Sequence, residues 1–222
     1  DSVHGKFSGD IKTTKNSIIV EGIEIQVTSI KQPAALPWEN IDIAMECTGI
    51  FTDREKAASH LKNGCSRVLI SAPAKNADKT IVYGVNHQTL TKNDIIVSNA
   101  SCTTNCLSPV AKVLHEKIGI RRGFMTTIHS YTGDQPVLDT MHDDLYRARA
   151  ANLSMIPTTT GAAKAVGLVL PELEGKLDGF AVRVPTPNVS AVDLTFEALQ
   201  ETSSLEINEE IHKAASTNLR GI

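Results

Sequence analysis

Short apolar runs alternate with helix-like segments through the first half of the chain, and this alternation restricts the fold to a small set. The runs that read as strands are 41–45, 68–71, 81–85 and 95–98, with a helix expected over 53–63. Apolar strands that alternate with helices are typical of α/β proteins with a mostly parallel, doubly wound sheet. Ligands bind such sheets at the carboxyl ends of the strands, so we expect Thr48, Gly49, Ser71 and Cys102 to gather at one edge.

The pattern changes after residue 101, which predicts a first domain over 1–101 and a second over 102–222. In the second domain, long strand-like runs at 123–129 and 179–198 enclose a polar loop at 133–155. This loop is longer than the usual connection between elements, and such loops are more often functional.

Turn and helix signals place three smaller elements. Glu21 and Gly22 interrupt alternating residues over 17–30, which predicts a β-hairpin. A final helix is expected over 201–218, and its apolar residues Leu205, Ile207 and Ile211 are predicted to face the core. Between these elements, the threonines at 158–160 read as a hydroxyl cap before a short helix that ends ahead of a proline.

The composition shows no bias toward nucleic acid or membranes. The chain has 222 residues, of which 41% are hydrophobic, and its formal net charge is −3. The basic residues are scattered rather than clustered, so we expect no nucleic-acid partner. No apolar run approaches the roughly 20 residues of a membrane-spanning helix, and the N-terminus lacks a signal-peptide pattern. We therefore expect a cytoplasmic protein with no membrane partner.

Four cysteines, Cys47, Cys65, Cys102 and Cys106, are spaced too irregularly for a secreted disulfide scaffold, so free thiols are expected. Cys47 and Cys65 lie in apolar contexts and are predicted to be core residues. Cys102 and Cys106 are four residues apart, a spacing that also suits a metal pair. No further cluster of histidines or cysteines completes a metal site, so none is predicted.

The segment SNASCTTNC, residues 98–106, carries the strongest chemical signal. It joins an expected strand to an amphipathic helix, which places Cys102 in the first turn of that helix. Free N–H groups and the positive end of the helix dipole stabilise a thiolate there. Ser101 and Thr103 flank the sulfur and suit either a helix cap or an anion site. The alternative for Cys102 is a buried structural cysteine.

A reactive cysteine needs a base, and His129 in the strand-like segment TTIHSYT supplies one. Spacing alone leaves His115 and His142 open as alternatives. Two further sequence signals each allow two interpretations. Thr160 and Gly161 fit either an anion-binding helix start or an ordinary cap, and Arg183 fits either an anion site or a solvated strand charge.

Four motifs in fixed order resolve much of this ambiguity. They are SNASCTTNC, TTIHSYTGDQ, RARAANLSMIPTTTGAAKAVGLVLPEL and AVRVPTPNVSAVDLTF. Together they make the chain resemble the phosphorylating glyceraldehyde-3-phosphate dehydrogenases. The resemblance implies a truncated Rossmann-type NAD-binding domain over 1–101, followed by an α+β catalytic domain with a mainly antiparallel sheet. It also implies a homotetramer and the oxidation of glyceraldehyde 3-phosphate to 1,3-bisphosphoglycerate in glycolysis.

The resemblance also assigns roles to single residues. Cys102 matches the nucleophile, which forms a hemithioacetal and then a thioester, and His129 matches its base. Two positions match the site for the substrate's phosphate, namely Thr132 and Arg183. Five match the site for inorganic phosphate, namely Ser101, Thr103, Arg147, Thr160 and Gly161, with Arg149 as an alternative to Arg147.

The cofactor implied by the resemblance is NAD, near Thr48, Gly49 and Ser71, although a Thr-Gly turn is otherwise an ordinary one. Thr140 and Met141 stand where many members have Leu-Pro, and Lys31 stands where many have arginine. These departures leave NADP open as the cofactor. NAD is preferred, because no additional arginine appears there to bind the 2′-phosphate of NADP.

The Gly-rich turn and acidic residue of the nucleotide fingerprint would lie before Asp1. The sequence is therefore expected to be a fragment that is nearly inactive in isolation. An inert or interaction module remains the alternative, and the erythrose-4-phosphate branch of the family fits less well.

Overall fold

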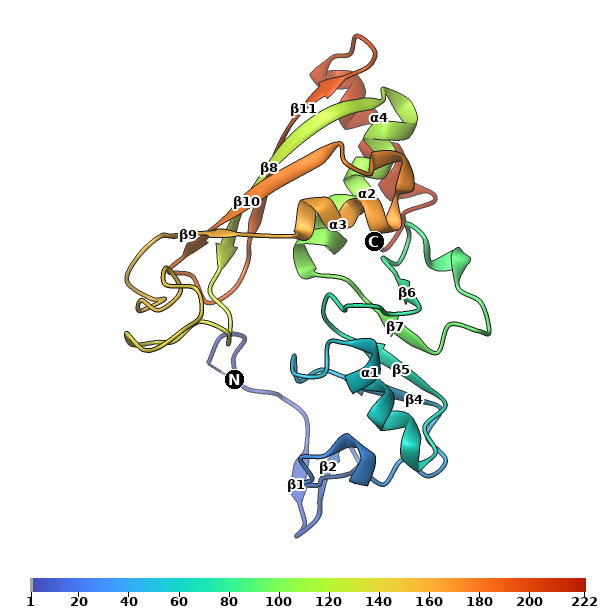
Figure 1. Ribbon diagram of the computed structural model, residues 1–222, viewed down its shortest axis with the longest axis vertical. Helices are drawn as coiled ribbons and strands as arrows, with labels where there is room; N and C mark the ends of the chain where they lie inside the picture. The colour runs from blue at the N-terminus through green and yellow to red at the C-terminus, as the bar shows by residue number, and fades with distance from the viewer. Residues whose placement is uncertain (1) are drawn as a thin grey trace.

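The computed structural model describes residues 2–222, which form three sheets and the helices that cover them (Figure 1). The first-domain sheet has the order β4-β5-β7-β6, and all of its pairings are parallel. Its strands are β4 (Ile43–Glu46), β5 (Arg67–Ile70), β6 (Lys79–Thr80) and β7 (Ile96–Ser98). The α/β prediction for this half is confirmed.

One face of the parallel sheet is covered by the connection between β4 and β5. This connection contains α1 (Arg54–Ala57) and the 3-10 helix η2 (Ala58–Asn63), close to the helix predicted over 53–63. Asp53 caps α1 by accepting a hydrogen bond from the Glu55 amide at 2.9 Å. Ala57 packs in a core with residues of β5 and β7, namely Val68, Ile70 and Ile96.

Two sequence predictions in this half are wrong, namely the strand at 81–85 and the core placement of Cys47. The strand predicted at 81–85 is absent, because Val82 turns toward the core around helix α2 and the next residues form a turn at Gly84. β4 is buried on one face only, with Ala44 and Glu46 buried and the alternate residues exposed. Cys47 is exposed rather than in the core, because it lies beyond the end of β4.

The predicted hairpin is confirmed, with one strand added. β1 (Ile11–Thr13), β2 (Ser17–Val20) and β3 (Ile23–Gln26) form a small antiparallel sheet. Glu21 and Gly22 connect β2 to β3 with φ angles of 49° and 81°. Two successive positive φ angles are typical of the tight turns that match the twist of a hairpin.

The second-domain sheet has the order β11-β8-β10-β9. Its strands are β8 (Ile120–Ser130), β9 (Ile156–Thr159), β10 (Leu177–Val184) and β11 (Ala191–Ala198). The outer pairings are antiparallel and the central β8–β10 pairing is parallel, so the sheet is mainly antiparallel as predicted. The run predicted at 179–198 is two strands, because Pro185 and Pro187 cannot donate to a ladder.

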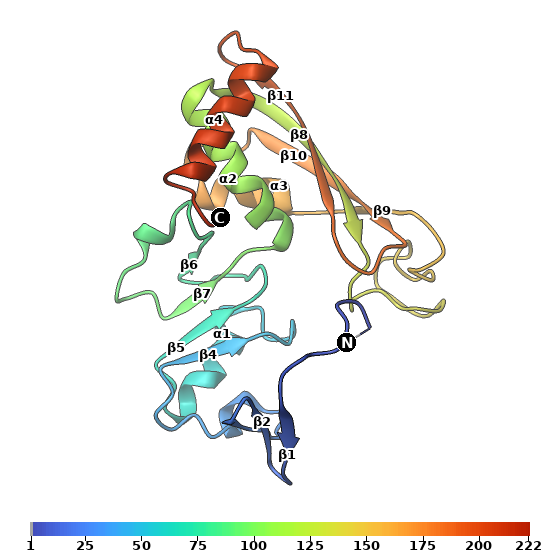
Figure 2. The same ribbon diagram turned by 180° about the vertical axis from the view of Figure 1, so that it is seen from behind.

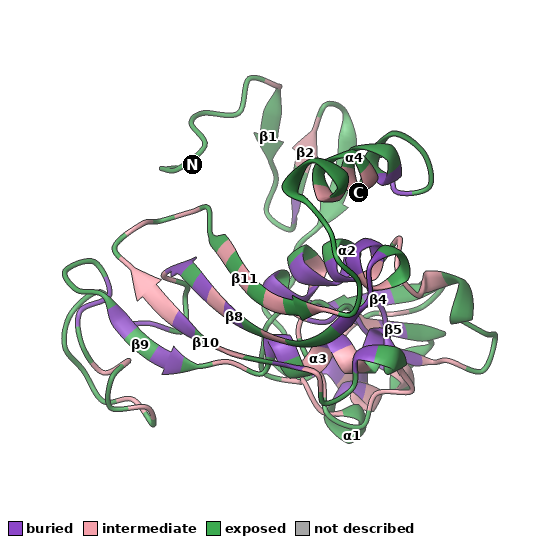
Figure 3. Ribbon diagram, turned by 90° about the horizontal axis from the view of Figure 1, so that it is seen from above, coloured by how far each residue is buried: buried purple, intermediate pink, exposed green. Residues whose placement is uncertain are grey.

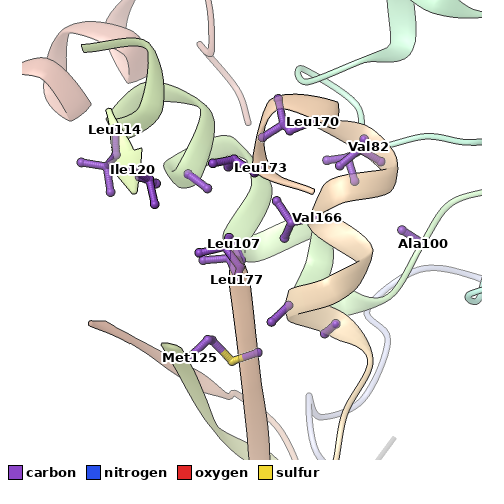
Figure 4. Packing of buried hydrophobic residues seen from close by; sticks show 14 of the residues in the cluster. Val82, Ala100, Leu107, Leu114, Ile120, Met125, Val166, Leu170, Leu173 and Leu177 are labelled. Carbon is purple, nitrogen blue, oxygen red and sulfur yellow. The ribbon is translucent and has the colours of Figure 1, made fainter. Parts of the chain in front are cut away.

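Helices α2 (Cys102–Lys117) and α3 (Ala162–Val169) pack against one face of this sheet (Figures 1 and 2). The core between them includes Leu107, Leu114, Ile120, Met125 and Val166 (Figure 4). Burial is concentrated in these two helices and the adjoining strands, whereas the hairpin is largely exposed (Figure 3). The core therefore fixes the start of α2 relative to β8 and β10.

The last helix is α4 (Ser204–Ser216), which packs against α2. Ile207 and Ile211 contact the core as predicted, but Leu205 is 67% exposed and its predicted inward orientation is wrong. Ser203 caps this helix, because its hydroxyl oxygen accepts a hydrogen bond from the Glu206 amide at 3.2 Å. Short 3-10 helices complete the fold: η1 (Pro33–Ala35), η3 (His87–Thr89) and η4 (Pro171–Leu173).

The segment from 131 to 155, between β8 and β9, contains no helix or strand, as predicted for the long loop. Within residues 2–222, no helix is both long and apolar enough to cross a membrane.

The close approach of β8 and β10 generates the first prediction. Gly179 in β10 lies opposite Met125 in β8, and a methyl group added at Gly179 would overlap the Met125 carbonyl oxygen. Gly179→Ala should lower the free energy of unfolding by about 1–3 kcal/mol, as overpacking does elsewhere. Urea denaturation measures this. Gly133→Ala is the control, because nothing lies within 4 Å of its added methyl. Equal stability of the two variants would show that the strands can separate without penalty.

Candidate active site

Cys102 is the first residue of α2 and its side chain is exposed. β7 ends at Ser98, and the chain turns into the helix through Ala100, whose φ is 55°. Ser101 is the N-cap, and its hydroxyl oxygen accepts a hydrogen bond from the Thr104 amide at 3.0 Å. The sulfur thus lies in the first turn of a long helix, as predicted, and is not sealed in the core.

His129 lies near the end of β8 and faces this sulfur. Its Nε2 atom is 3.3 Å from Cys102 Sγ, and its Nδ1 atom is 2.7 Å from the Ser130 carbonyl oxygen. Two lone pairs do not approach so closely, so Nδ1 carries a proton and donates it to this carbonyl. Nε2 can therefore accept the thiol proton, or donate to the thiolate once it holds that proton.

The two other candidate histidines have different partners. His115 Nδ1 accepts a hydrogen bond from the Ile120 amide at 3.0 Å, beyond the other end of α2. His142 Nδ1 accepts one from the Asp144 amide at 2.9 Å, in the long loop. The structure thus brings His129 to the sulfur and leaves the alternatives engaged elsewhere.

Arg183 stands beside His129 because β10 pairs with β8 and places these two residues in register. Its Nη1 atom donates to the Ser130 carbonyl at 2.9 Å and to Thr132 Oγ1 at 3.4 Å. Nη1 also lies 3.1 Å from His129 Nδ1, but its two hydrogens serve these oxygens, so Nδ1 keeps its own proton for the Ser130 carbonyl. Burial is the main cause that lowers the pKa of Arg183 below its ordinary value, and the positive charge of Arg147 adds to this effect. Among the residues described, Arg183 Nε is buried without a hydrogen-bond partner, so this cation still lacks a full set of acceptors.

Two hollows meet at the Cys102–His129 pair, and both are lined by Cys102, Thr103, Thr127 and His129. The larger, of about 400 Å³, is also lined by Cys106, Ser130, Thr132, Ser190 and Val192. The smaller, of about 210 Å³, is also lined by Ser101, Arg147, Thr159, Thr160, Gly161, Ala181 and Arg183. All nine second-domain and junction residues predicted for the site therefore border one hollow or the other.

Arg147, rather than Arg149, faces the smaller hollow. Its Nη1 donates to Asp134 Oδ2 at 2.8 Å and its Nε donates to Thr158 Oγ1 at 3.0 Å. Burial raises the pKa of the Asp134 carboxyl, but the hydrogen bond and charge of Arg147 outweigh it and lower that pKa overall. Arg149 forms an ion pair with Asp139 at 2.8 Å and is mostly exposed.

The predicted hydroxyl cap at 158–160 is only partly correct. Thr158 and Thr159 belong to β9, and the Thr158 hydroxyl donates to Asp144 Oδ2 at 2.8 Å. Thr160 Oγ1 accepts a hydrogen bond from the Ala162 amide at 3.1 Å, at the start of α3. The sequence analysis missed Asp134, and no local pattern indicates that it holds an arginine thirteen residues away.

Thr48, Gly49 and Ser71 border neither of these hollows. They follow the carboxyl ends of β4 and β5, two strands of the sheet whose third strand, β7, leads to Cys102. They therefore share one sheet edge with Cys102, as predicted, but no hydrogen bond joins them to it within residues 2–222.

Glu46 is a buried carboxylate that shapes this edge, and the sequence analysis did not find it. Its Oε1 accepts hydrogen bonds from the backbone amide and from the side-chain hydroxyl of Thr48, and the distance from the Thr48 amide nitrogen to Oε1 is 2.8 Å. Its Oε2 lies 2.7 Å from Nε2 of His60. The other ring nitrogen of His60, Nδ1, accepts a hydrogen bond from Trp38 Nε1 at 3.2 Å. The only signal in the sequence was a glutamate at the end of an otherwise apolar strand.

The four cysteines are all free, and residues 2–222 contain no cluster of three or more His, Cys, Asp or Glu side chains suited to a metal ion.

Comparison with known proteins identifies the family. Residues 101–222 match the sequence profile described as "Glyceraldehyde 3-phosphate dehydrogenase, C-terminal domain", and residues 1–54 match the "NAD binding domain" of the same family. The chain belongs to the glyceraldehyde-3-phosphate dehydrogenase family. The resemblance inferred from the four motifs is thus confirmed, as is NAD as the cofactor of the family.

Individual glyceraldehyde-3-phosphate dehydrogenases match the chain along its whole length. The protein from Cereibacter sphaeroides is 68% identical over 222 residues, and that from Xanthobacter flavus is 65% identical over 224. The protein from Geobacillus stearothermophilus is 57% identical over 225 residues. Each alignment covers 100% of this chain and 67% of the relative, so the chain spans about two thirds of their length.

The edge beside Thr48 fits a nucleotide cofactor of this family in shape. Gly49 has a φ of 75° and nothing lies within 4 Å of where its Cβ would be, so the backbone there is open to a ligand. Glu46 already binds the Thr48 amide and hydroxyl, so Thr48 contributes a fixed turn rather than free donors.

The Glu46 carboxylate generates a prediction about pH. Burial raises its pKa, but hydrogen bonds from Thr48 and His60 outweigh this and lower it below the ordinary 4.5. Its contribution to stability is therefore full above pH 4.5 and is lost as the pH falls through the lower folded-state pKa. Glu46→Gln should lower the free energy of unfolding by about 1–3 kcal/mol at pH 7, and the deficit should shrink below pH 4.5.

Urea denaturation from pH 7 to pH 3 measures this deficit. Glu201→Gln, at an exposed position, is the matched control and should show no deficit. A deficit for Glu46→Gln that stays constant across this pH range would contradict the assignment.

Proposed function

We propose that this chain carries the catalytic site of a phosphorylating glyceraldehyde-3-phosphate dehydrogenase, with residues 1–101 as its NAD-binding part and 102–222 as its catalytic part. The reaction is the oxidation of D-glyceraldehyde 3-phosphate to 1,3-bisphosphoglycerate with reduction of NAD. The observation that carries the proposal is the 3.3 Å contact between Cys102 Sγ and His129 Nε2 at the start of α2. Such a pair is the arrangement expected for a thiolate nucleophile and its base.

In the first step, His129 Nε2 takes the proton of the Cys102 thiol. The thiolate then adds to the aldehyde carbon: a C–S bond forms, the carbonyl π bond breaks, and the oxygen takes the proton back from His129 Nε2 to give a hemithioacetal. The Ser130 carbonyl holds Nδ1–H, so the ring keeps Nε2 directed at the reacting atoms throughout. Helix α2 adds its free N–H groups, which favour negative charge on the sulfur.

In the oxidation step, the hydroxyl proton of the hemithioacetal passes to His129 Nε2 as the carbonyl re-forms. NAD, when bound, accepts the hydride that leaves the same carbon. The product is a thioester on Cys102. Inorganic phosphate then attacks the thioester carbon, a C–O bond forms and the C–S bond breaks. The thiolate that leaves is again paired with His129.

Both the substrate's phosphate and inorganic phosphate must lie near one sulfur, and the two hollows supply the room. Thr132 and Arg183, joined at 3.4 Å, are proposed to hold the substrate's phosphate. Ser101, Thr103, Arg147, Thr160 and Gly161, which line the smaller hollow, are proposed to hold inorganic phosphate. Arg183 also lines that hollow, so its charge acts on both groups.

Thr48, Gly49 and Ser71 are proposed to border NAD at the sheet edge. NAD is preferred over NADP because the sequence offers no additional arginine for a 2′-phosphate near Thr140. The family resemblance further supports a glycolytic, cytoplasmic homotetramer.

Two cysteine variants test the proposal. Cys102→Ser should abolish NADH formation, because serine lacks a thiolate that can form the thioester. Cys106→Ser should largely spare it, because Cys106 lies one turn further along α2. The assay is the ultraviolet absorbance of NADH with glyceraldehyde 3-phosphate, NAD and phosphate, with these residues in a protein of the relatives' full length, because the 222-residue chain alone is expected to be nearly inactive. Equal losses in the two variants would refute the assignment of the nucleophile.

Iodoacetamide alkylation of Cys102 is measured alongside. Alkylation of Cys102 in the 222-residue chain at the slow rate of an ordinary free thiol would favour an inert module, because His129 would then not activate the sulfur.

The two nearby arginines test the phosphate assignment. Arg147→Gln should raise the KM for inorganic phosphate by roughly tenfold or more, because it removes a charged hydrogen-bond donor from the smaller hollow. Arg149→Gln is the matched control and should change this KM little, since Arg149 pairs with Asp139 and is mostly exposed. Protection of Cys102 from alkylation by phosphate gives a second readout. Similar effects of the two variants would count against the role of Arg147.

A further inference from the structure

The loop between β10 and β11, residues 185–190, lies against the residue that follows His129. The Ser130 amide donates a hydrogen bond to Ser190 Oγ at 3.1 Å. The Tyr131 amide donates to the Thr186 carbonyl oxygen at 3.2 Å. The loop thus holds the backbone on both sides of Ser130.

The Ser130 carbonyl oxygen is the group that orients His129. It accepts hydrogen bonds from His129 Nδ1 at 2.7 Å and from Arg183 Nη1 at 2.9 Å. Any rotation of this carbonyl would move the imidazole ring and change the direction of Nε2 relative to Cys102. The position of Ser130 therefore controls the contact on which the proposed chemistry depends.

Ser190 holds the Ser130 amide on the β11 side of β8, while Ser130 remains paired with Val184 of β10 on the other side. The β8–β11 pairing ends at Ala191 and Ile128, so the Ser130 amide lies beyond the last backbone pair. The Ser190 hydroxyl takes the place of the missing backbone acceptor. It also lies 3.4 Å from Ser130 Oγ, and both residues line the larger hollow beside Cys102.

The backbone just before Ser190 is strained. Val189 has a φ of 66°, a left-handed conformation that a β-branched residue rarely adopts. Its side chain is 80% exposed, so burial of this side chain does not account for the conformation. Strain of this kind persists where the surrounding structure imposes it and is concentrated at functional sites. Here the strained turn at Val189 places the Ser190 hydroxyl where it accepts the hydrogen bond of the Ser130 amide.

We propose that Ser190 is a positioning residue for His129. Its hydroxyl fixes Ser130, whose carbonyl fixes the imidazole Nδ1–H, and this chain of contacts aims Nε2 at Cys102 Sγ. The inference rests on the proposed function for the pairing of His129 with Cys102. It adds a residue that touches neither the sulfur nor the imidazole but acts through Ser130.

The test uses the 222-residue chain with Cys47→Ser and Cys106→Ser in the background, so that Cys102 is the only exposed thiol. Ser190→Ala, Ser190→Thr and Ser203→Ala are compared in this background. Ser203→Ala is the matched control, because it removes a hydroxyl that accepts a backbone N–H at the N-cap of α4. The readouts are the alkylation rate of Cys102 by iodoacetamide from pH 5 to pH 9, amide exchange at Ser130, and the ¹⁵N shifts of the His129 ring.

Ser190→Ala should slow alkylation near pH 7 by roughly threefold to tenfold, the range that one lost hydrogen bond accounts for. It should also speed exchange of the Ser130 amide and shift the His129 ring nitrogens. Ser190→Thr, which keeps the hydroxyl, should restore all three readouts, and Ser203→Ala should leave them unchanged. Unaltered alkylation and His129 shifts in Ser190→Ala would overturn the proposal, even if the protein became less stable. Failure of Ser190→Thr to restore them while folded would overturn it too.

His129→Asn separates this proposal from the proposed function. An unchanged alkylation rate in His129→Asn would refute the Cys102–His129 pair. The Ser130 exchange rate would still report whether Ser190 holds Ser130. If His129→Asn slows the alkylation of Cys102 but Ser190→Ala does not, the role of Ser190 is refuted and the Cys102–His129 pair is not.

Discussion

The contact between a cysteine sulfur and a histidine nitrogen, 3.3 Å long, joins the start of one element to the end of another. Cys102 begins α2, and His129 is the penultimate residue of β8. Such a contact persists only if the helix and strand share a rigid core, because a shift of about 1 Å is enough to weaken chemistry of this kind. Leu107, Met125 and Val166 supply that core, and Arg183 and Ser130 then refine the orientation of the ring.

The electrostatics of the site follow from the same frame. Arg147 and Arg183 both line the smaller hollow, and the charge of Arg147 adds to the effect of burial in lowering the pKa of Arg183. Asp134 offsets part of this repulsion through its 2.8 Å bond to Arg147. The result is a pair of cations that line the same hollow. Such an arrangement favours multiply charged oxyanions over single carboxylates.

The sequence analysis succeeded where local chemistry decides structure. The Ser101 cap fixed the start of α2, and Glu21-Gly22 fixed the hairpin, since both depend on residues adjacent in the chain. The strand predicted at 81–85 failed because apolar residues serve packing as well as pairing, and only the tertiary structure shows which. The partnerships of Glu46 with His60 and of Arg147 with Asp134 join residues far apart in sequence, where no periodic pattern connects them.

The parallel register of β8 and β10 has an evolutionary consequence. Arg183 faces the same neighbours as His129 only because the two strands are paired without a slip. Deletion of one residue within β10 would turn Arg183 to the opposite face of the sheet. Insertions in 131–155 add length outside any ladder and leave this alignment intact. Natural variation in length should therefore be excluded from β10 and tolerated only in those parts of the loop that do not position Thr132 and Arg147.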